Sequence, residues 1–302
     1  MQDRLKFAAV GVGLIALFGA ALGIGALVGD PAGPASDHGA QHATEGVAAT
    51  GLSDSESGYR LVDLTAPTAP NQAGTLQFRI TGPDGTPVTR FTTQHEKKLH
   101  LIVVRTDTTG YRHVHPTMDA AGGWSIDWSW AAPGTYRVFA DFIPETAGSP
   151  GDLVLSRTVT VAGDPASQPL PPVAETASVD GYRVARGGEL TTSGGKLRFT
   201  ISRDGTPVTD LEPYLGANAH LVALRATDLA YLHVHPQTDG TRGPNVVFHA
   251  QAPGPGSYRL YLDFAHGGTV RTAEFTVEAA ADEKLTAPST SGGGHHTGGG
   301  QR

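Results

Sequence analysis

The chain has 302 residues, a formal net charge of −7 and no cysteine. Without cysteine it has neither a disulfide nor a lipid anchor on cysteine, so packing or a bound metal must provide its stability. The negative charge and the lack of a basic stripe exclude nucleic acid as an expected partner. Glycine and proline make up about a fifth of the residues, which is typical of a β-rich protein with many turns.

An uncharged apolar run at residues 7–28 is the first predicted element. It is long enough to cross a bilayer of about 30 Å as a helix. Arg4 and Lys6 precede it, and by the positive-inside rule they keep the N-terminus in the cytoplasm. We therefore expect residues 1–28 to form a single-pass anchor in the cell membrane, with everything after it extracytoplasmic. Secretion after cleavage of this segment as a signal peptide is the alternative.

Two copies of one domain follow the anchor. Tyr59-Arg60 in the first copy matches Tyr182-Arg183 in the second, and the hexapeptide DGTPVT occurs in both. Each copy, here called repeat 1 and repeat 2, has about 100 residues, enough to bury a core of its own. The predicted segments are a flexible linker at 29–57, repeat 1 at 58–162, a Pro-rich linker at 163–180, repeat 2 at 181–278 and a disordered Gly/His tail at 279–302.

Short apolar runs separated by turn signals predict strands rather than helices in both repeats. In repeat 1 we expect strands at 59–64, 75–81, 87–91, 98–105, 111–116, 124–130, 135–142 and 153–161. This number of short strands predicts an all-β fold of two tandem immunoglobulin-like or cupredoxin-like sandwiches. Trp124, Trp128 and Trp130 alternate with polar residues, so we expect them in the core of repeat 1.

A pattern of three histidines occurs in both repeats at the same spacing. Repeat 1 has His100, His113 and His115, and repeat 2 has His220, His233 and His235. Alternate residues of a strand share a face, so the two histidines of each HVHP sequence point the same way. With a loop at 106–109, the antiparallel register places Ile102 opposite His113 and His100 opposite His115, and the equivalent loop pairs His220 with His235.

Three neutral imidazoles on one hairpin suit Cu(II), Zn(II) or Ni(II), and we take copper(II) or zinc(II) as the first choice. His95 is a further candidate ligand that only repeat 1 offers, because Leu215 stands at its position in repeat 2. Two other interpretations stay open. The histidines could be a structural cluster that bonds to carbonyl, Asp or Tyr oxygens, or they could recognise a ligand other than a metal.

The remaining polar motifs give weaker signals. Asp141 and Asp263 occupy equivalent strand positions and are candidates for orienting a histidine or for capping a turn. We expect no catalytic residue, because no serine or carboxylate pair forms a known nucleophile motif. The histidines expected to be solvated are His38, His42, His249, His266, His295 and His296.

The apolar strand that begins with His, the HVHP ending and the P-G-x-Y-R-x-x-x-D-F strand together carry a resemblance. They resemble the β-sandwich domains of uncharacterised bacterial membrane-anchored proteins, similar in outline to cupredoxin-like and YtkA-like extracytoplasmic modules. The resemblance covers about two thirds of the chain. It implies an extracytoplasmic β-domain associated with heavy-metal or copper handling. The chain lacks the Cys and Met ligands of an electron-transfer cupredoxin, which puts a redox role in doubt.

Two functional hypotheses follow from the sequence. In the first, the protein is held in the membrane by its N-terminal helix and binds copper or zinc through one histidine site per repeat, for buffering or for delivery to an extracytoplasmic or membrane partner. In the second, it is a tandem adhesion or scaffold module in which the histidines only stabilise each hairpin.

Overall fold

The computed structural model describes residues 50–232, 234–237 and 241–281, with only the backbone for His235. These residues form strands and loops, and they include no helix long and apolar enough to cross a membrane. The predicted anchor at 1–28 and nearly all of the predicted tail lie outside the described residues. The described part is all-β, as the sequence predicts.

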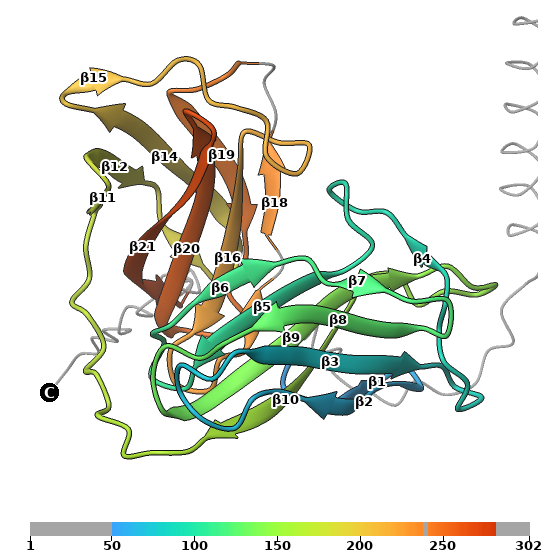
Figure 1. Cartoon of the computed structure of the whole chain (residues 1–302). Coiled ribbons are helices and arrows are strands. Elements are labelled where there is room, and N and C mark those ends of the chain that lie inside the picture. Colours follow the sequence, from blue (N-terminus) through green and yellow to red (C-terminus); the bar gives the residue numbers. More distant parts are fainter. Residues whose placement is uncertain (1–49, 233, 238–240, 282–302) are drawn as a thin grey trace, which may run out of the picture. The chain divides into compact units, whose positions relative to one another are not determined.

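Repeat 1 is a sandwich of two sheets, drawn from blue to green in Figure 1. One sheet has the order β1-β2-β3-β8-β7 and the other β10-β9-β5-β6, with β4 added to β9. β3 pairs with β8 in the first sheet, and β5 pairs with β9 in the second. The chain therefore crosses from one sheet to the other between β3 and β5 and again between β8 and β9, as it does in immunoglobulin-like domains. Its strands are β1 (Ser55–Glu56), β2 (Tyr59–Thr65), β3 (Gly74–Thr81), β4 (Phe91–Thr92), β5 (His100–Arg105), β6 (Arg112–Val114), β7 (Thr117–Met118), β8 (Gly123–Trp128), β9 (Gly134–Pro144) and β10 (Leu153–Val161).

Repeat 2 has the same two-sheet architecture. Its sheets have the orders β11-β12-β14-β19-β18, with β15 on β14, and β13-β21-β20-β16-β17. Its strands are β11 (Thr176–Val179), β12 (Tyr182–Gly187), β13 (Leu190–Thr191), β14 (Gly195–Arg203), β15 (Thr206–Pro207), β16 (Ala219–Arg225), β17 (Tyr231–Leu232), β18 (Val234–Gln237), β19 (Asn245–Ala250), β20 (Gly256–His266) and β21 (Thr269–Ala280). The protein is therefore two tandem immunoglobulin-like sandwiches.

Each sandwich has its own apolar core, built from the alternation of side chains along its strands. In β3 the side chains of Leu76, Phe78 and Ile80 are buried and those between them are exposed. Trp124, Trp128 and Trp130 are at most 3% exposed and belong to the core of repeat 1. The prediction that these tryptophans are core residues is confirmed.

The strand β5 is buried along its whole length, because both of its faces are covered. Leu101 and Val103 point into the core of repeat 1, whereas Ile102 and Val104 belong to a third apolar cluster. This third cluster contains residues of both repeats, including Leu224 and Tyr261 of repeat 2. One sheet of each sandwich thus contributes its outer face to an interface between the repeats.

Aromatic residues and buried hydroxyls connect the two sheets at this interface. Tyr111 of repeat 1 stacks on Tyr261 of repeat 2 with ring centroids 4.0 Å apart and an interplanar angle of 4°. The Tyr261 hydroxyl donates to the Thr108 carbonyl at 2.6 Å. The Tyr231 hydroxyl of repeat 2 donates to the carboxylate of Asp141 in repeat 1 at 3.0 Å. These polar groups are buried, and their hydrogen-bond partners belong to the other repeat. Separating the two repeats would therefore leave them unpaired.

Most expected strands of repeat 1 form, with small differences at their ends. The expected strand at 87–91 is reduced to an isolated bridge at Pro87 and the two-residue strand β4, since proline supplies no amide proton to a ladder. Residues 50–57, expected in a flexible linker, contribute a bridge from Thr50 to Tyr231 and the strand β1. The strand β11 begins at Thr176, so repeat 2 starts a few residues before position 181.

The second histidine hairpin differs from its expected form. In repeat 2, β16 pairs with β17 only at Ala223 and Leu224, and the chain then passes to the other sheet as β18. The backbone of His235 lies opposite His249 of β19. The expected pairing of His220 with His235 is therefore wrong, because β18 takes its hydrogen bonds from the opposite sheet.

Because both repeats contribute to the third apolar cluster, a substitution that destabilises repeat 2 should also destabilise repeat 1. All three tryptophans lie in repeat 1, so tryptophan fluorescence reports its unfolding alone. Leu224 of repeat 2 is 0% exposed within the cluster, and Leu224→Ala should lower the free energy of unfolding by about 2 kcal/mol or more. In urea titrations of the full chain the fluorescence transition should move to lower urea. Val270→Ala, at a 45% exposed position, is the control. A shift in circular dichroism with no shift in fluorescence would mean that the repeats unfold independently.

Candidate metal centre

Three histidines of repeat 1 converge on one point beside the interface. His100 is the first residue of β5, His113 lies in β6, and His115 follows β6 by one residue. One ring nitrogen of each lies within 4.8 Å of the others. Ile102 pairs with His113 in the ladder, which confirms the predicted register of this hairpin. We call His100, His113 and His115 the triad.

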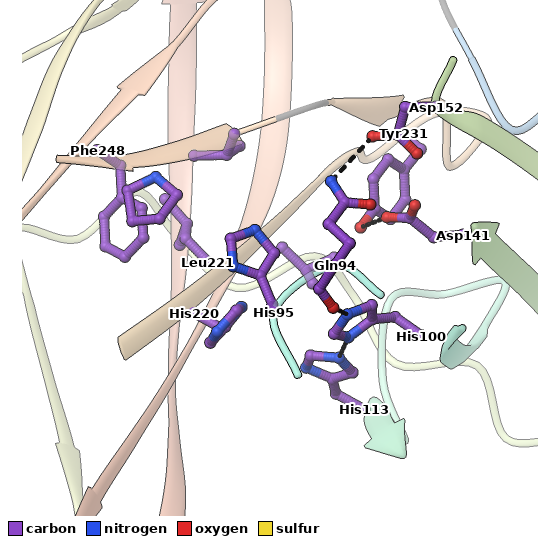
Figure 2. A pocket seen from close by; sticks show the side chains of 13 residues that line it. Gln94, His95, His100, His113, Asp141, Asp152, His220, Leu221, Tyr231 and Phe248 are labelled. Carbon is purple, nitrogen blue, oxygen red and sulfur yellow. Dashed lines mark hydrogen bonds between the residues drawn. The ribbon is translucent and has the colours of Figure 1, made fainter. Parts of the chain in front are cut away.

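The backbone decides which nitrogen of His100 carries the proton. Its Nε2 lies 3.0 Å from the carbonyl oxygen of Gln94, which can only accept a hydrogen bond, so Nε2 is the protonated nitrogen. In a neutral ring Nδ1 is then a bare lone pair. This nitrogen lies 3.0 Å from Nε2 of His113 and 3.2 Å from Nε2 of His115. Figure 2 shows Gln94, His100 and His113 in this arrangement.

A carboxylate of repeat 2 orients His113 in the same way. The Nδ1 atom of His113 donates to Oδ2 of Asp263 at 2.9 Å, and both side chains are at most 4% exposed. Asp263 also accepts hydrogen bonds from the hydroxyls of Tyr111, at 3.2 Å, and Thr272, at 2.6 Å. The proton on Nδ1 leaves Nε2 of His113 as the nitrogen that faces His100. A histidine whose far nitrogen is bonded to a carboxylate is typical of metal ligands.

The separations of the three rings match those of imidazoles around one ion. With a metal–nitrogen distance of about 2.0–2.1 Å, the centroid of a bound ring lies about 3.2 Å from the ion. Two such rings at the tetrahedral angle then have centroids about 5.2 Å apart. The observed separations are 5.2 Å for His100 and His113, 5.0 Å for His100 and His115, and 5.0 Å for His113 and His115. The triad therefore fits a tetrahedral ion with one position left for another ligand.

Burial keeps two rings of the triad in the neutral form that binds metals. It lowers the pKa of His100 to about 4 and the pKa of His115 to about 2, and neighbouring imidazoles add to both effects. At neutral pH each of these two rings therefore has one nitrogen without a proton, which is free to bind a cation.

Histidines of the second repeat do not form a separate centre in the described part of the chain. His220, the counterpart of His100, has its ring centroid 6.1 Å from those of His100 and of His113. His95 of repeat 1 lies 4.8 Å from His220. His220 thus lies beside the triad of repeat 1, and the interpretation of one site per repeat stays a prediction. His233 and the side chain of His235 lie outside the described residues, and their metal binding stays a prediction.

A small cavity adjoins the triad, with a volume of about 50 Å³. His95, His100, His113 and His220 line it, and carboxylates also reach it (Figure 2). A volume of this size holds one ion or one or two water molecules. The cavity therefore provides room for a ligand at the open position of a metal in the triad.

The other histidines have different surroundings. His249 is exposed, as expected. His266 was expected to be solvated, but its ring lies 2.6 Å from the Tyr182 hydroxyl and 3.1 Å from a carboxylate oxygen of Asp210. The remaining histidines, His38, His42, His295 and His296, lie outside the described residues.

Two tyrosines at the site were not singled out from the sequence. Tyr111 and Tyr231 precede HVHP by two residues in each repeat, and this recurrence was the signal that could have identified them. Burial raises the pKa of both hydroxyls well above its usual value, with a nearby Asp carboxylate adding to the effect. Both therefore stay protonated and act as donors, Tyr111 to Asp263 and Tyr231 to Asp141.

The sequence matches one protein family twice, the Domain of unknown function (DUF8832), over residues 54–153 and 177–281. The two matches cover about two thirds of the chain. The chain belongs to this family. One DUF8832 segment covers most of each sandwich, although the first ends where β10 begins, and the double match confirms the internal repeat. No curated protein matches the sequence.

Several solved structures match this DUF8832 protein at low similarity. Invasin, a bacterial integrin-binding protein, is 13% identical over 74% of this chain and 39% of its own, with a TM-score of 0.23. Domains 4–9 of the surface layer protein SbsC are 13% identical over 74% of this chain and 31% of theirs, with a TM-score of 0.23. The titin Ig tandem domains A164-A165 are 11% identical over 71% of this chain and 91% of theirs, with a TM-score of 0.19.

These scores are too low to carry an argument about function, and this chain spans well under half of invasin and of the SbsC fragment. Neither the matching family nor these three structures is a cupredoxin or a YtkA-like protein. The expected kinship with those modules is therefore not confirmed, and the immunoglobulin-like assignment rests on the observed sheets.

The neutral histidines predict a pH dependence for the metal-free protein. Burial lowers the pKa of His100 and of His220 to about 4, whereas both titrate near 6.5 when unfolded. Between these values the unfolded chain binds more protons than the folded one, so stability falls as the pH decreases from about 6.5 to about 4. Urea unfolding with a chelator at pH 7 and pH 5 should show this loss. His100→Gln and His220→Gln should each reduce it, and the exposed His249→Gln should not. An equal loss in all three variants would contradict the assignment.

Proposed function

We propose that the protein binds a divalent transition metal, copper(II) or zinc(II), through His100, His113 and His115. The observation that carries this proposal is the convergence of three ring nitrogens, two of which belong to rings whose other nitrogen is bonded to an oxygen acceptor. With those protons held by Gln94 and Asp263, Nδ1 of His100 and Nε2 of His113 are the nitrogens that face each other and that an ion would use.

The ligand chemistry supports the choice of metal. Imidazole nitrogen suits zinc, copper(II) and nickel, whereas hard ions such as calcium and magnesium prefer oxygen. The chain has no cysteine and only two methionines, so it offers few of the soft ligands that select copper(I). The open fourth position beside a cavity supports an exchangeable ligand there, as buffering or delivery of the metal requires.

The proposed place of action comes from the sequence. We propose that the apolar segment at 7–28 anchors the protein in the cell membrane and that both sandwiches are extracytoplasmic. In that compartment the protein would hold a metal ion and pass it to a membrane or extracytoplasmic partner. A binding role rather than a catalytic one is part of the proposal.

Metal titration of the full chain tests the proposal. The protein is purified in detergent, stripped with a chelator, and carries Ser at His38, His42, His295 and His296 so that the predicted flexible segments cannot chelate. Calorimetry with Zn(II) and Cu(II) should show at least one saturable site, which the triple variant His100→Gln, His113→Gln, His115→Gln should lose. His249→Gln should bind as the parent does. Unchanged binding by the triple variant would overturn the proposal and favour the tandem adhesion or scaffold module, with structural histidines.

Asp263 should control the affinity without touching the metal. Its carboxylate fixes the ring and the proton of His113, and loss of such a partner typically weakens metal binding by about 10–100-fold. We expect Asp263→Asn to show a loss in this range by competition with a chromophoric chelator. Tyr111→Phe is the matched control, because it removes another hydrogen bond to Asp263 and leaves His113 paired. Parent-like affinity in a folded Asp263→Asn protein would show that His113 is not positioned by this carboxylate.

A further inference from the structure

The cavity beside the triad has a second pair of imidazoles that the triad does not use. His95 belongs to repeat 1 and His220 to repeat 2, and both line the cavity (Figure 2). Their ring centroids are 4.8 Å apart at an interplanar angle of 84°. Rings bound to one ion have centroids about 4.5 Å apart at a right angle and about 5.2 Å apart at the tetrahedral angle. The separation of His95 and His220 lies between these limits.

The separations between ring centroids also show that this pair is distinct from the triad. His95 lies 6.1 Å from His100, and His220 lies 6.1 Å from His100 and from His113. These separations exceed the tetrahedral value by about 1 Å, so neither ring is close enough to serve the ion of the triad as its fourth ligand. An ion held by His95 and His220 would occupy a position of its own.

His220 is prepared for binding in the same way as His100. Its Nε2 lies 3.2 Å from the carbonyl oxygen of Leu215, which can only accept, so Nδ1 is the bare nitrogen of the neutral ring. The carbonyl comes from a two-residue hairpin turn, formed by Tyr214 and Ala217 with Leu215 and Gly216 between them. Repeat 1 supplies the Gln94 carbonyl to His100 from the equivalent turn, Gln94 to Lys97.

The turn of repeat 1 holds His95 in an unfavourable backbone conformation. Both of its central residues have positive φ, 48° at His95 and 63° at Glu96, where such turns favour Asn and Gly. In repeat 2 the corresponding positions hold Leu215 and Gly216. Two residues with side chains at positive φ are a form of strain that clusters at functional sites. The strained turn directs the ring of His95 towards His220.

The charges around the cavity are suited to more than one cation. Asp141 and Asp152 line it, and Asp263 contacts His113 of the triad. Neutral imidazoles bring no negative charge, so these three carboxylates are the groups that offset the repulsion between two dications. From this geometry we infer that His95 and His220 form a second metal position, which spans the two repeats and completes its coordination with water or a lining carboxylate.

This inference extends the proposed metal binding but is tested apart from it. The full chain in detergent, with Ser at His38, His42, His295 and His296, is titrated with Cu(II) and examined by electron paramagnetic resonance. The first equivalent should give an isolated Cu(II) signal. The second should produce dipolar broadening and a half-field transition, because the cavity that holds the second ion adjoins the triad that holds the first.

His95→Leu is the deciding variant, since Leu already occupies the equivalent position at φ 56° in repeat 2. It should lose the second equivalent and the half-field transition, while the affinity for the first changes by less than about threefold. His220→Gln should do the same, and His266→Gln should bind both equivalents. Two coupled ions in His95→Leu, or a second equivalent lost only in His220→Gln, would overturn the inference. Two equivalents that bind unchanged to the triple variant without the triad would instead refute the proposed function.

Discussion

The carboxylate of Asp263 is the group on which the rest of the site depends. It is 1% exposed at the interface between the repeats, and burying a carboxylate is costly unless hydrogen bonds satisfy it. Two of its donors, Tyr111 and His113, come from the other repeat, and the third is Thr272 of its own. The same contacts that make the buried charge tolerable therefore hold the two sheets together and fix the proton of His113, a ligand of the proposed metal site. The same residues therefore form the interface between the repeats and the proposed metal site.

The contacts are reciprocal, although the two repeats have diverged. Tyr231 donates to Asp141 as Tyr111 donates to Asp263, so the equivalent tyrosine and aspartate pair in both directions across the interface. Opposite Asp263 in the ladder stands Thr272, which donates to it, whereas Val154 stands opposite Asp141. The difference gives Asp263 a donor that Asp141 lacks at this position. In the described part of the chain, the well-defined triad accordingly belongs to repeat 1, with its carboxylate supplied by repeat 2.

Local periodicity predicted the sandwich and one hairpin, but not which surfaces meet. Ile102 and His113 were placed opposite each other because the loop length fixes the register, and the tryptophans were placed in the core by their alternation. An apolar residue such as Ile102 looks the same in sequence whether it faces its own core or another domain. The approach of His220 to the triad could not be predicted for that reason. Nor could the carbonyls of Gln94 and Leu215, since a backbone oxygen has no signature of its own in the sequence.

The neutral state of the buried rings links stability to binding. Folding places His100, His115 and His220 where protonation is disfavoured, which weakens the metal-free fold under acidic conditions. The same burial presents bare nitrogens that need no deprotonation before they bind a cation. Because Asp263 of repeat 2 orients His113 of repeat 1, an ion bound at the proposed site would favour the assembled pair of repeats by mass action. A single sandwich could not provide this, since half of the groups that orient and line the site belong to its neighbour.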